Sequence, residues 1–553
     1  MRQAGWRLGW KAGAGLLLGV LEAFSGLSAT AVQPGQARVA ETKPIPAIVE
    51  KDGRFALMVD GKPYLMLGVQ ANNSSAWPAS LDKVWPAAMT LHANTVELPI
   101  YWEQLEPAEG KFDFSVVDLI VKQARDDHLH LVLLWFGTWK NGSSHYTPEW
   151  IKLNQTKYPF LRSAQGETVD SPSPFSEAFL HADEDAFRTL MRHLREVDPG
   201  RTVLMVQVEN EAGVWGGVRD YGSAAEAAFA GQVPARLVKG LGKQPGTWQQ
   251  VFGDDADEAF EAWYTASYIE QVAAAGKKEY TLPLYVNAAL RDPLHPGKPG
   301  TYESGAPTDN NIDIWKIAAP SINLVAPDIY MPDYDRYMKV IELYKRKDNP
   351  LLIPETGNSP AYARYVYAAI GNGALGWSPF GLDYTGYSNH PDGPEAMESS
   401  ALKPFAQQYA LLAPIDGMLA MGEFEGKVRG TCEDPKNHVQ TLSFERWQAV
   451  IKYGMPSFGN WMQPQGNNPP DGGVVILELG PNEFLVAGHH VRVDFTAAFA
   501  PGKKRLFVKV EEGSYDAAGK WKMTRVWNGD QTDYGLNLRA DENVLLRVSL
   551  TTF

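Results

Sequence analysis

The sequence contains a single cysteine, Cys432, among its 553 residues. A lone thiol cannot close a disulfide within the chain, nor can it supply the several sulfur ligands of a structural zinc site. Histidine motifs are also missing. There is no HExxH pattern, and the adjacent His489 and His490 would point to opposite faces of a strand. We therefore expect no metal ion and no other cofactor.

Positive charge and long apolar runs are scarce too. The formal net charge of −14 disfavours nucleic acid as a partner, because phosphate binding depends on Lys and Arg. Beyond the N-terminus, no stretch approaches the roughly 20 apolar residues of a membrane helix, so stable membrane insertion is not expected. Apolar residues make up 44% of the chain and charged residues 21%, which is typical of a globular protein.

The first residues have the features of an export signal. Three basic residues open the chain: Arg2, Arg7 and Lys11. An apolar run follows at 12–24, and the small residues at 29–31 offer a cleavage site. We expect a signal peptide at 1–31, a linker at 32–45 and a periplasmic location, with secretion as another outcome of export. A disordered or membrane-tethered N-terminus is the alternative.

Short apolar runs then recur with room for a helix between them. Eight runs are predicted as strands: Tyr64–Gln70, Thr95–Trp102, Leu129–Phe136, Thr202–Glu211, Pro283–Leu290, Asn323–Tyr330, Pro350–Gly357 and Ala374–Phe380. Helical patterns separate several of them, at 114–127, 183–196, 256–275 and 334–345. This alternation predicts a (β/α)8 barrel, of the α/β class, over residues 46–412. A doubly wound open sheet of six or seven such strands is the alternative.

The rhythm changes from about residue 413. Nine short runs, separated by Pro, Gly and Asn turns, are predicted as strands: Met418–Phe424, His438–Phe444, Ala449–Tyr453, Val474–Leu479, Phe484–Ala487, Val491–Phe495, Arg505–Val510, Trp521–Trp527 and Val544–Leu550. They predict a sandwich-like, all-β accessory domain over residues 413–553.

Two of the predicted barrel strands end in carboxylates. The fourth ends in Glu209, Asn210 and Glu211, and the seventh ends in Glu355. Such residues are costly to bury without partners, but the carboxyl ends of barrel strands are where active sites are built. Because side chains alternate along a strand, we expect Glu209 and Glu211 to share one side and Asn210 to take the other, unless the strand end twists.

Glycoside hydrolysis requires two carboxyl groups on either side of the scissile bond. One protonates the departing oxygen, while the other attacks the anomeric carbon or activates water. A separation of about 5–5.5 Å gives retention and a wider one gives inversion. The pair Glu211 and Glu355 therefore predicts a glycosidase.

The same residues resemble a known family. Asn210-Glu211 after the fourth strand and Glu355 after the seventh resemble the retaining clan of (β/α)8 glycosidases. Within that clan, 207–211 and the segments 98–107 and 110–114 resemble the β-galactosidases of glycoside hydrolase family 35. Two departures, Glu211-Ala212-Gly213 in place of Glu-Tyr-Gly and the altered motif at 102–107, point to a divergent bacterial branch. Such a branch removes terminal β-galactose from polysaccharide side chains like those of xyloglucan.

This resemblance implies roles for individual residues. Glu211 would be the acid/base, Glu355 the nucleophile, and Asn210 the partner of the sugar 2-hydroxyl. Five further residues would contact substrate or orient its neighbours: Tyr330 on the nucleophile, Trp377 as a stacking floor, Tyr101, Trp102 and Trp135 at the ends of strands two and three. Glu209 would orient a neighbour or a sugar hydroxyl. For the aromatic residues, ordinary core packing is the alternative.

Other functions remain open at this point. A glycosidase of the same clan acting on glucosides or arabinosides is the nearest alternative, and a carbohydrate-binding barrel without turnover is another. A metal-dependent barrel hydrolase is disfavoured because histidine is missing near these strand ends. The expected partner is a carbohydrate, and the sequence leaves the oligomeric state open.

Overall fold

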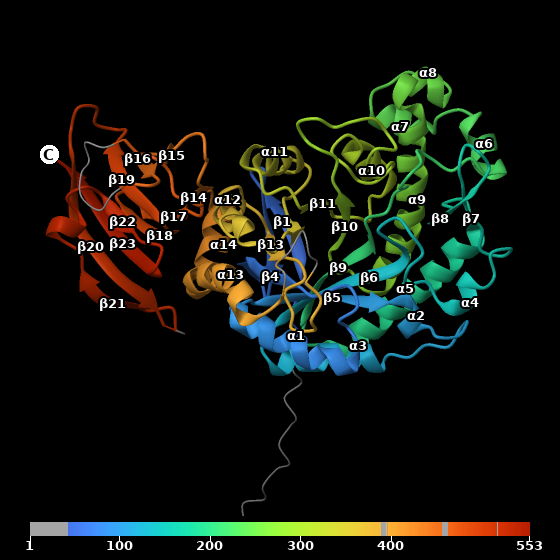
Figure 1. Cartoon of the computed structure of the whole chain (residues 1–553), viewed down its shortest axis with the longest axis horizontal. Helices are drawn as coiled ribbons and strands as arrows, with labels where there is room; N and C mark the ends of the chain where they lie inside the picture. Colours follow the sequence, from blue (N-terminus) through green and yellow to red (C-terminus); the bar gives the residue numbers. More distant parts are fainter. Residues whose placement is uncertain (1–42, 389–393, 395, 456–462, 517) are drawn as a thin grey trace, which may run out of the picture. The chain divides into compact units, whose positions relative to one another are not determined.

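Eight parallel strands close into a barrel (Figure 1). They are β4 Met66–Gln70, β5 Thr95–Tyr101, β6 His130–Lys140, β9 Val203–Asn210, β10 Leu284–Ala289, β11 Leu324–Ile329, β12 Ile353–Thr356 and β13 Gly376–Pro379. The structure is a computed structural model that describes residues 43–388, 394, 396–455, 463–516 and 518–553. The pairing of β9 with β10 closes the barrel, so the barrel prediction is confirmed and the open-sheet alternative is wrong. The expected signal peptide at 1–31 lies outside the described residues.

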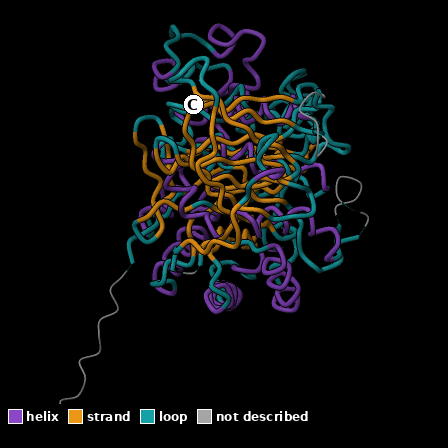
Figure 2. The backbone as a smooth tube through the Cα atoms, turned by 90° about the vertical axis from the view of Figure 1, so that its left-hand side faces the viewer, coloured by secondary structure: helices purple, strands orange, loops and turns teal. Residues whose placement is uncertain are grey.

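Helices between the strands cover the barrel. The main ones are α1 Pro78–Leu91, α3 Ser115–Asp126, α5 Glu177–Val197, α9 Ala256–Glu279, α10 Ile312–Ala318, α11 Tyr334–Tyr344, α12 Tyr365–Gly371 and α13 Ser399–Leu412. Figure 2 views the chain from the side of the C-terminal β-sheets, whose strands lie toward the viewer, with helices visible around them. In α3 the buried residues recur at helical spacing, as in Val117, Ile120 and Val121. The helix α5 begins before the predicted residue 183, because the Ser176 side chain caps its first turn.

Nearly every residue of the barrel strands is buried. This burial explains their continuous apolar sequence, because helices cover one face and the barrel interior the other. Before the barrel, β1 Ala47–Lys51, β2 Arg54–Val59 and β3 Lys62–Tyr64 form a small antiparallel sheet. The first barrel strand therefore begins at Met66, because Tyr64 pairs with Leu57 of β2 instead.

Long insertions follow two barrel strands at their carboxyl ends. After β6 come α4 Glu149–Lys152, β7 Phe160–Arg162 and β8 Thr168–Pro172. After β9 come α6 Ser223–Phe229, α7 Ala235–Gly240 and α8 Trp248–Phe252. Both insertions start at the barrel end where (β/α)8 enzymes carry their active sites.

The C-terminal region forms two antiparallel sheets. The larger contains β14 Val428–Cys432, β17 Gly473–Gly480, β18 Glu483–His489, β20 Arg505–Tyr515, β21 Trp521–Val526 and β23 Val544–Thr552. The smaller contains β15 Val439–Ser443, β16 Trp447–Lys452, β19 Val491–Ala497 and β22 Leu536–Leu538. Buried side chains from both sheets, including Trp447, Phe484 and Leu546, form a hydrophobic core of their own. The prediction of a C-terminal all-β region is thus confirmed.

One predicted strand in this region is wrong. Residues 418–424 belong to the helix α14 Asp416–Glu425, which buries Leu419, Ala420 and Gly422. A short apolar run does not by itself distinguish a strand from a buried helix. The decisive residue is Gly426, which ends the helix in the left-handed conformation at φ 78°.

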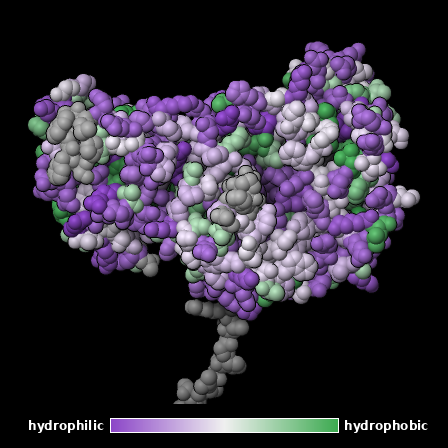
Figure 3. All heavy atoms as spheres, viewed as in Figure 1, coloured by the Kyte–Doolittle hydropathy of each residue, from purple (hydrophilic) through white to green (hydrophobic). Residues whose placement is uncertain are grey.

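The face of the molecule in Figure 3 is mostly hydrophilic, with hydrophobic residues scattered over it. Among the described residues, no helix combines the length and the apolar character needed to cross a membrane.

Candidate active site

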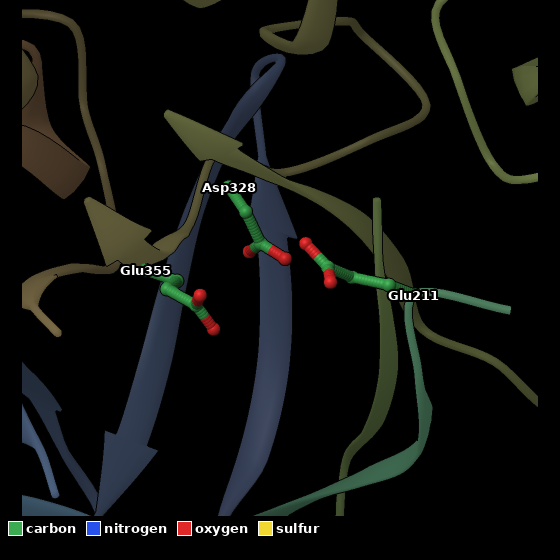
Figure 4. A group of neighbouring side chains, drawn as sticks. All are labelled: Glu211, Asp328 and Glu355. Carbon is green, nitrogen blue, oxygen red and sulfur yellow. The ribbon is translucent and has the colours of Figure 1, made fainter. Parts of the chain in front are cut away.

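Glu211 and Glu355 meet at the mouth of the barrel, together with Asp328 (Figure 4). Glu211 follows the last residue of β9, while Asp328 lies on β11 and Glu355 on β12. One carboxyl oxygen from each lies within 4.8 Å of the others. All three side chains are buried, with Glu211 at 9% exposure and Glu355 at 5%. The structure therefore brings together the two carboxylates that the sequence singled out.

The carboxylate of Glu355 is held at both oxygens. The Tyr330 hydroxyl donates a hydrogen bond to Oε1, and Nε2 of Gln70 donates to Oε2 over 3.0 Å. Burial, and after it the charge of Glu211, raises the pKa of Glu355 to about 7. Lys140 and the two hydrogen bonds lower the pKa and oppose that shift. This carboxylate has a fixed orientation, as a nucleophile requires.

The backbone around Glu211 is strained. Glu209 has φ 61° and Glu211 has φ 47°, both in the left-handed region that non-glycine residues seldom adopt. Such strain persists only where neighbouring structure holds it, and it gathers at functional sites. Here the Glu211 N–H donates to Oδ1 of Asn287 over 3.0 Å.

This strain overturns the expectation that Glu209 and Glu211 share one side. The left-handed residues break the alternation of the strand, and Glu209 does not join the cluster of Glu211, Asp328 and Glu355. Its carboxylate accepts the N–H of Trp139 over 2.6 Å and lies against Asp183 of α5. Glu209 therefore contacts the layer between barrel and helices, where it positions neighbouring residues.

Asn210 is fully buried between them. Neither Oδ1 nor Nδ2 of its side chain has a hydrogen-bond partner among the described residues. Buried amides in native proteins are nearly always paired. A sugar hydroxyl would supply the partner that the predicted role of Asn210 requires.

Trp377 does not line the site as expected. Trp377 donates its indole N–H to the Tyr337 hydroxyl of α11 over 2.9 Å and stacks on Phe405 of α13. The prediction that Trp377 forms a stacking floor is therefore wrong, because its ring points into the helix layer.

Trp102 and Trp135 are also packing residues. Trp102 donates to Glu106 over 2.8 Å, and Trp135 donates to Asp183 over 2.9 Å. Their rings pack on each other at 6.2 Å, and both side chains are fully buried. These two rings therefore pack in the protein interior, and the predicted sugar contacts of Trp102 and Trp135 are wrong.

Tyr101 lies beneath the surface rather than on it. Its hydroxyl accepts the N–H of Ala76 over 3.0 Å, and its ring stacks on Tyr146 at 4.8 Å. Tyr146 in turn lines a cavity of about 350 Å³. The other lining residues are Asn72, Asn73, Ser74, Ser75, Thr385 and Tyr387. Tyr101 supports this cavity and is itself fully buried, which favours core packing, the alternative to its predicted contact with substrate.

Sequence reasoning missed three charged residues of the site. Asp328 accepts a hydrogen bond from Nδ2 of Asn287 over 2.6 Å. Burial and the charges of Glu355 and Glu211 raise the pKa of Asp328 well above its usual range. Asp328 and Lys140, at the end of β6, could have been found from the sequence, because each is a single charged residue within an apolar strand.

Lys140 and Glu303 extend the charged cluster. Lys140 is 5% exposed and pairs in register with Asn210. Glu303 comes from the loop after β10, and its burial, together with the charge of Glu211, raises the pKa of Glu303 well above its usual range. No motif marked Glu303, because it lies in a long loop whose path only the folded chain defines.

The three central carboxylates also have a spacing that suits a divalent cation. However, Tyr330, Gln70 and Asn287 already donate hydrogen bonds to the oxygens of Glu355 and Asp328. Those donors fit carboxylates arranged for proton transfer and nucleophilic attack.

Comparison with protein families gives two matches. A glycoside hydrolase family 42 model described as beta-galactosidase matches residues 76–274, which include β5, β6 and β9 with Glu211. A model described as a domain of unknown function matches residues 405–539.

A curated beta-galactosidase of Xanthomonas manihotis is 31% identical over 166 residues. The match covers 28% of this chain and 25% of that protein. The chain thus spans about a quarter of the length of this relative.

Among solved structures, the beta-galactosidase of Bacillus circulans sp. alkalophilus is similar at 13% identity and a TM-score of 0.45, over 64% of this chain and 57% of that one. The beta-galactosidase of the psychrophilic Marinomonas ef1 is similar at 15% identity and a TM-score of 0.47, over 65% of this chain and 62% of that one. The catalytic domain of the Paenibacillus polymyxa beta-amylase is similar at 12% identity and a TM-score of 0.46, over 62% of this chain and 96% of that one. These similarities are too distant to carry a conclusion about function.

Proposed function

We propose that this protein is a retaining, exo-acting β-glycosidase and that its substrate is a terminal β-galactoside. The observation that carries the proposal is the approach of Glu211 and Glu355, whose nearest oxygens lie within 4.8 Å at the barrel mouth. That approach fits the short separation of retaining enzymes, since inverting enzymes leave about 6.5–9.5 Å for a water molecule.

In the first step, ionised Glu355 attacks the anomeric carbon and forms a glycosyl ester. Glu211 donates its proton to the departing oxygen at the same time. Tyr330 and Gln70 hold the two oxygens of Glu355, so that little orientation is lost on the way to the transition state.

In the second step, Glu211 removes a proton from water, and the water oxygen attacks the anomeric carbon. The ester bond to Glu355 breaks, and the sugar leaves with its original configuration. Asn210 is placed next to the acid/base, where its unpaired amide would bind the 2-hydroxyl, a contact that strengthens in the transition state.

Two similarities support galactose as the sugar. They are the beta-galactosidase model over residues 76–274 and the Xanthomonas manihotis relative. The motif at 207–211 adds the resemblance to family 35, and we keep a divergent bacterial branch acting on xyloglucan-like side chains as the finer proposal. Export through the segment at 1–31 stays a prediction, which sequencing the N-terminus of the mature protein would test.

The test is turnover of a panel of nitrophenyl β-glycosides by the full-length protein. We expect β-galactoside to be hydrolysed fastest, with the β-anomer of the free sugar seen first by NMR. Faster hydrolysis of a β-glucoside or an arabinoside would show that the preferred sugar is not galactose. Activity that a chelator removes and a divalent cation restores would favour a metal-dependent hydrolase instead.

Variants of the two carboxylates test their roles. Glu355→Ala should lose activity by about a thousandfold or more, with azide restoring part of it and giving a product of inverted configuration. Glu211→Ala should keep the glycosylation step for nitrophenyl substrates, because their leaving groups need little protonation. The matched control is Glu167→Gln, at an exposed carboxylate far along the insertion after β6. Full activity of both catalytic variants would contradict the assignment, as would no turnover by the wild-type protein.

A further inference from the structure

A third carboxyl group lies beside the catalytic pair, and the mechanism above does not use it. Asp328 is located on β11, two residues before Tyr330, and is 2% exposed. Its carboxyl group points toward that of Glu211 from across the barrel mouth (Figure 4). An isolated buried carboxylate is costly, so its contacts indicate what it does.

Asn287 ties Asp328 to Glu211. Its Nδ2 donates to Oδ2 of Asp328 over 2.6 Å, and its Oδ1 accepts the N–H of Glu211 over 3.0 Å. One amide on β10 therefore fixes the side chain of Asp328 relative to the strained backbone that carries Glu211. The bridge therefore holds the Asp328 carboxyl group near the backbone position from which the Glu211 side chain extends.

The second oxygen of Asp328 has no ordinary donor. Oδ1 is buried and receives no N–H or hydroxyl from the described residues. The carboxyl group that faces it is that of Glu211 (Figure 4), and an oxygen of each group lies within 4.8 Å of the other. Two carboxylates this close repel each other when both are ionised, and a single proton between them removes the repulsion and gives each an acceptor or donor.

The charged surroundings favour such a proton. The titratable groups that face Asp328 and Glu211 from the neighbouring elements are Lys140, Tyr285, Glu303, Tyr330, Tyr344 and Glu355. Lys140 is the one basic residue among these, and it interacts with the carboxyl groups of Glu303, Asp328 and Glu355. Burial of this cluster is possible only if some of the carboxyl groups hold a proton.

We propose that Asp328 shares one proton with Glu211 and thereby keeps the acid/base protonated for the first step of the reaction. Asp328 is then a positioning residue, since it acts through Glu211 and not on the sugar. This inference rests on the proposed glycosidase function.

The proton balance of the reaction is consistent with this role. Before the first step, Glu355 carries one negative charge and the Asp328–Glu211 pair carries another. When the ester forms, Glu355 becomes neutral while the shared proton leaves with the departing oxygen, so both members of the pair are ionised. Water then returns one proton to the pair as its oxygen attacks the anomeric carbon. The buried cluster keeps the same net charge in every stable state, which avoids a large electrostatic cost.

The test is the pH profile of kcat/KM for Asp328→Asn, an isosteric variant that can neither ionise nor share a proton. Without the second carboxylate, the loss of the Glu211 proton no longer creates an adjacent pair of charges. Glu355 also has one negative neighbour fewer. Both limbs of the profile should therefore move to lower pH by about one unit or more. Above neutral pH, an alkyl galactoside should lose more kcat than the nitrophenyl galactoside, because only the alkyl leaving group needs the proton.

Glu97→Gln is the matched control. Glu97 is also a buried barrel carboxyl group, and burial raises its pKa to about 8. It accepts a hydrogen bond from the Tyr285 hydroxyl over 3.1 Å and is not among the carboxyl groups that cluster with Glu211. Its loss should leave the alkaline limb in place. An unchanged alkaline limb in Asp328→Asn, or an equal shift in both variants, would overturn the inference while leaving the glycosidase proposal intact. Failure of the wild-type protein to cleave any glycoside would instead remove the proposed function.

If Asp328→Asn has no activity at any pH, infrared titration of the folded protein decides. The wild-type protein should show a protonated carboxyl band that disappears at a higher pH than the corresponding band of Asp328→Asn. Identical titrations of the two proteins would contradict the shared proton.

Discussion

The hydroxyl of Tyr330 donates a hydrogen bond to Oε1 of Glu355, joining the sixth and seventh strands of the barrel at the carboxylate that we assign as nucleophile. The neighbouring register pairs, Asp328 with Glu355 and Ile329 with Thr356, bring the ends of β11 and β12 side by side. The contact is therefore a consequence of strand pairing, and it turns a strand-end glutamate into a carboxylate of defined orientation.

Tyr330→Phe removes this hydrogen bond while keeping the ring. We expect kcat/KM to fall about 10–100-fold, because a hydrogen bond to a charged group contributes about 1.5–3 kcal/mol. The acid limb of the pH profile should also move to higher pH, since the bond from Tyr330 lowers the pKa of Glu355. Tyr344→Phe is the control, because its buried hydroxyl contacts the carbonyl of Pro307 and not the nucleophile. Equal losses in both variants would assign Tyr330 a structural role only.

The pKa of Glu355 predicts how stability depends on pH. Burial and Glu211 raise it from the usual 4.5 to about 7, so between these pH values the native state binds more protons than the unfolded state. Stability from this group is therefore present below pH 4.5 and is lost as the pH rises through about 7. Relative to wild type, Glu355→Gln should gain about 2 kcal/mol between about pH 5 and about pH 8, as measured by urea unfolding. Glu167→Gln, at an exposed carboxylate, should show no such trend, and a parallel trend in both would argue against the shift.

The same pKa applies to catalysis. Because Glu355 must be ionised to attack, kcat/KM should fall as the pH drops below about 7. Steady-state rates across the pH range give this limb directly. A plateau extending well below that pH would mean that the nucleophile is ionised more easily than its burial indicates.

Trp377 and Tyr146 should separate packing from substrate contact. Trp377→Phe loses the hydrogen bond to Tyr337 and part of the packing on α13, at a cost of about 1–3 kcal/mol in stability, with KM unchanged. Tyr146→Ala removes an aromatic wall of the cavity near Asn72, and we expect a higher KM together with a loss of about 1–3 kcal/mol in stability, because the ring also packs on Tyr101 and Phe136. Thermal unfolding and kinetics on the same preparations test both. A raised KM in Trp377→Phe would indicate that the Trp377 ring stacks on the substrate, as the sequence predicted.

Gly430 lies where the β region packs against α12. A Cβ atom at this position would come within 2.3 Å of the Tyr367 carbonyl and 3.1 Å of Gly371. Gly430→Ala should therefore destabilise the chain by about 1–3 kcal/mol, measured by thermal or urea unfolding. At Gly480, in the adjacent strand β17, the same substitution would meet nothing within 4 Å and should cost far less. Comparable losses at both sites would indicate a propensity effect and not a clash.

The barrel and the strand positions of its two glutamates follow from the periodicity of the amino-acid sequence. Apolar runs alternating with helical patterns repeat locally, so they identify the eight barrel strands without knowledge of the folded chain. Because the carboxyl ends of all barrel strands lie at one rim, residues as distant in sequence as Glu211 and Glu355 could be placed together.

The direction of individual side chains, and the contacts between them, depend on the folded structure. The left-handed backbone at Glu209 and Glu211 separates two residues that simple alternation would keep on one side. Trp377 turns into the helix layer, because α11 and α13 offer it a hydrogen bond and a stacking partner. Asp328 lies beside Glu211 and Glu355 because the closed barrel brings the ends of β9, β11 and β12 to one rim. Strand periodicity is encoded locally, whereas side-chain direction at a strand end depends on backbone angles and partners that distant parts of the chain supply.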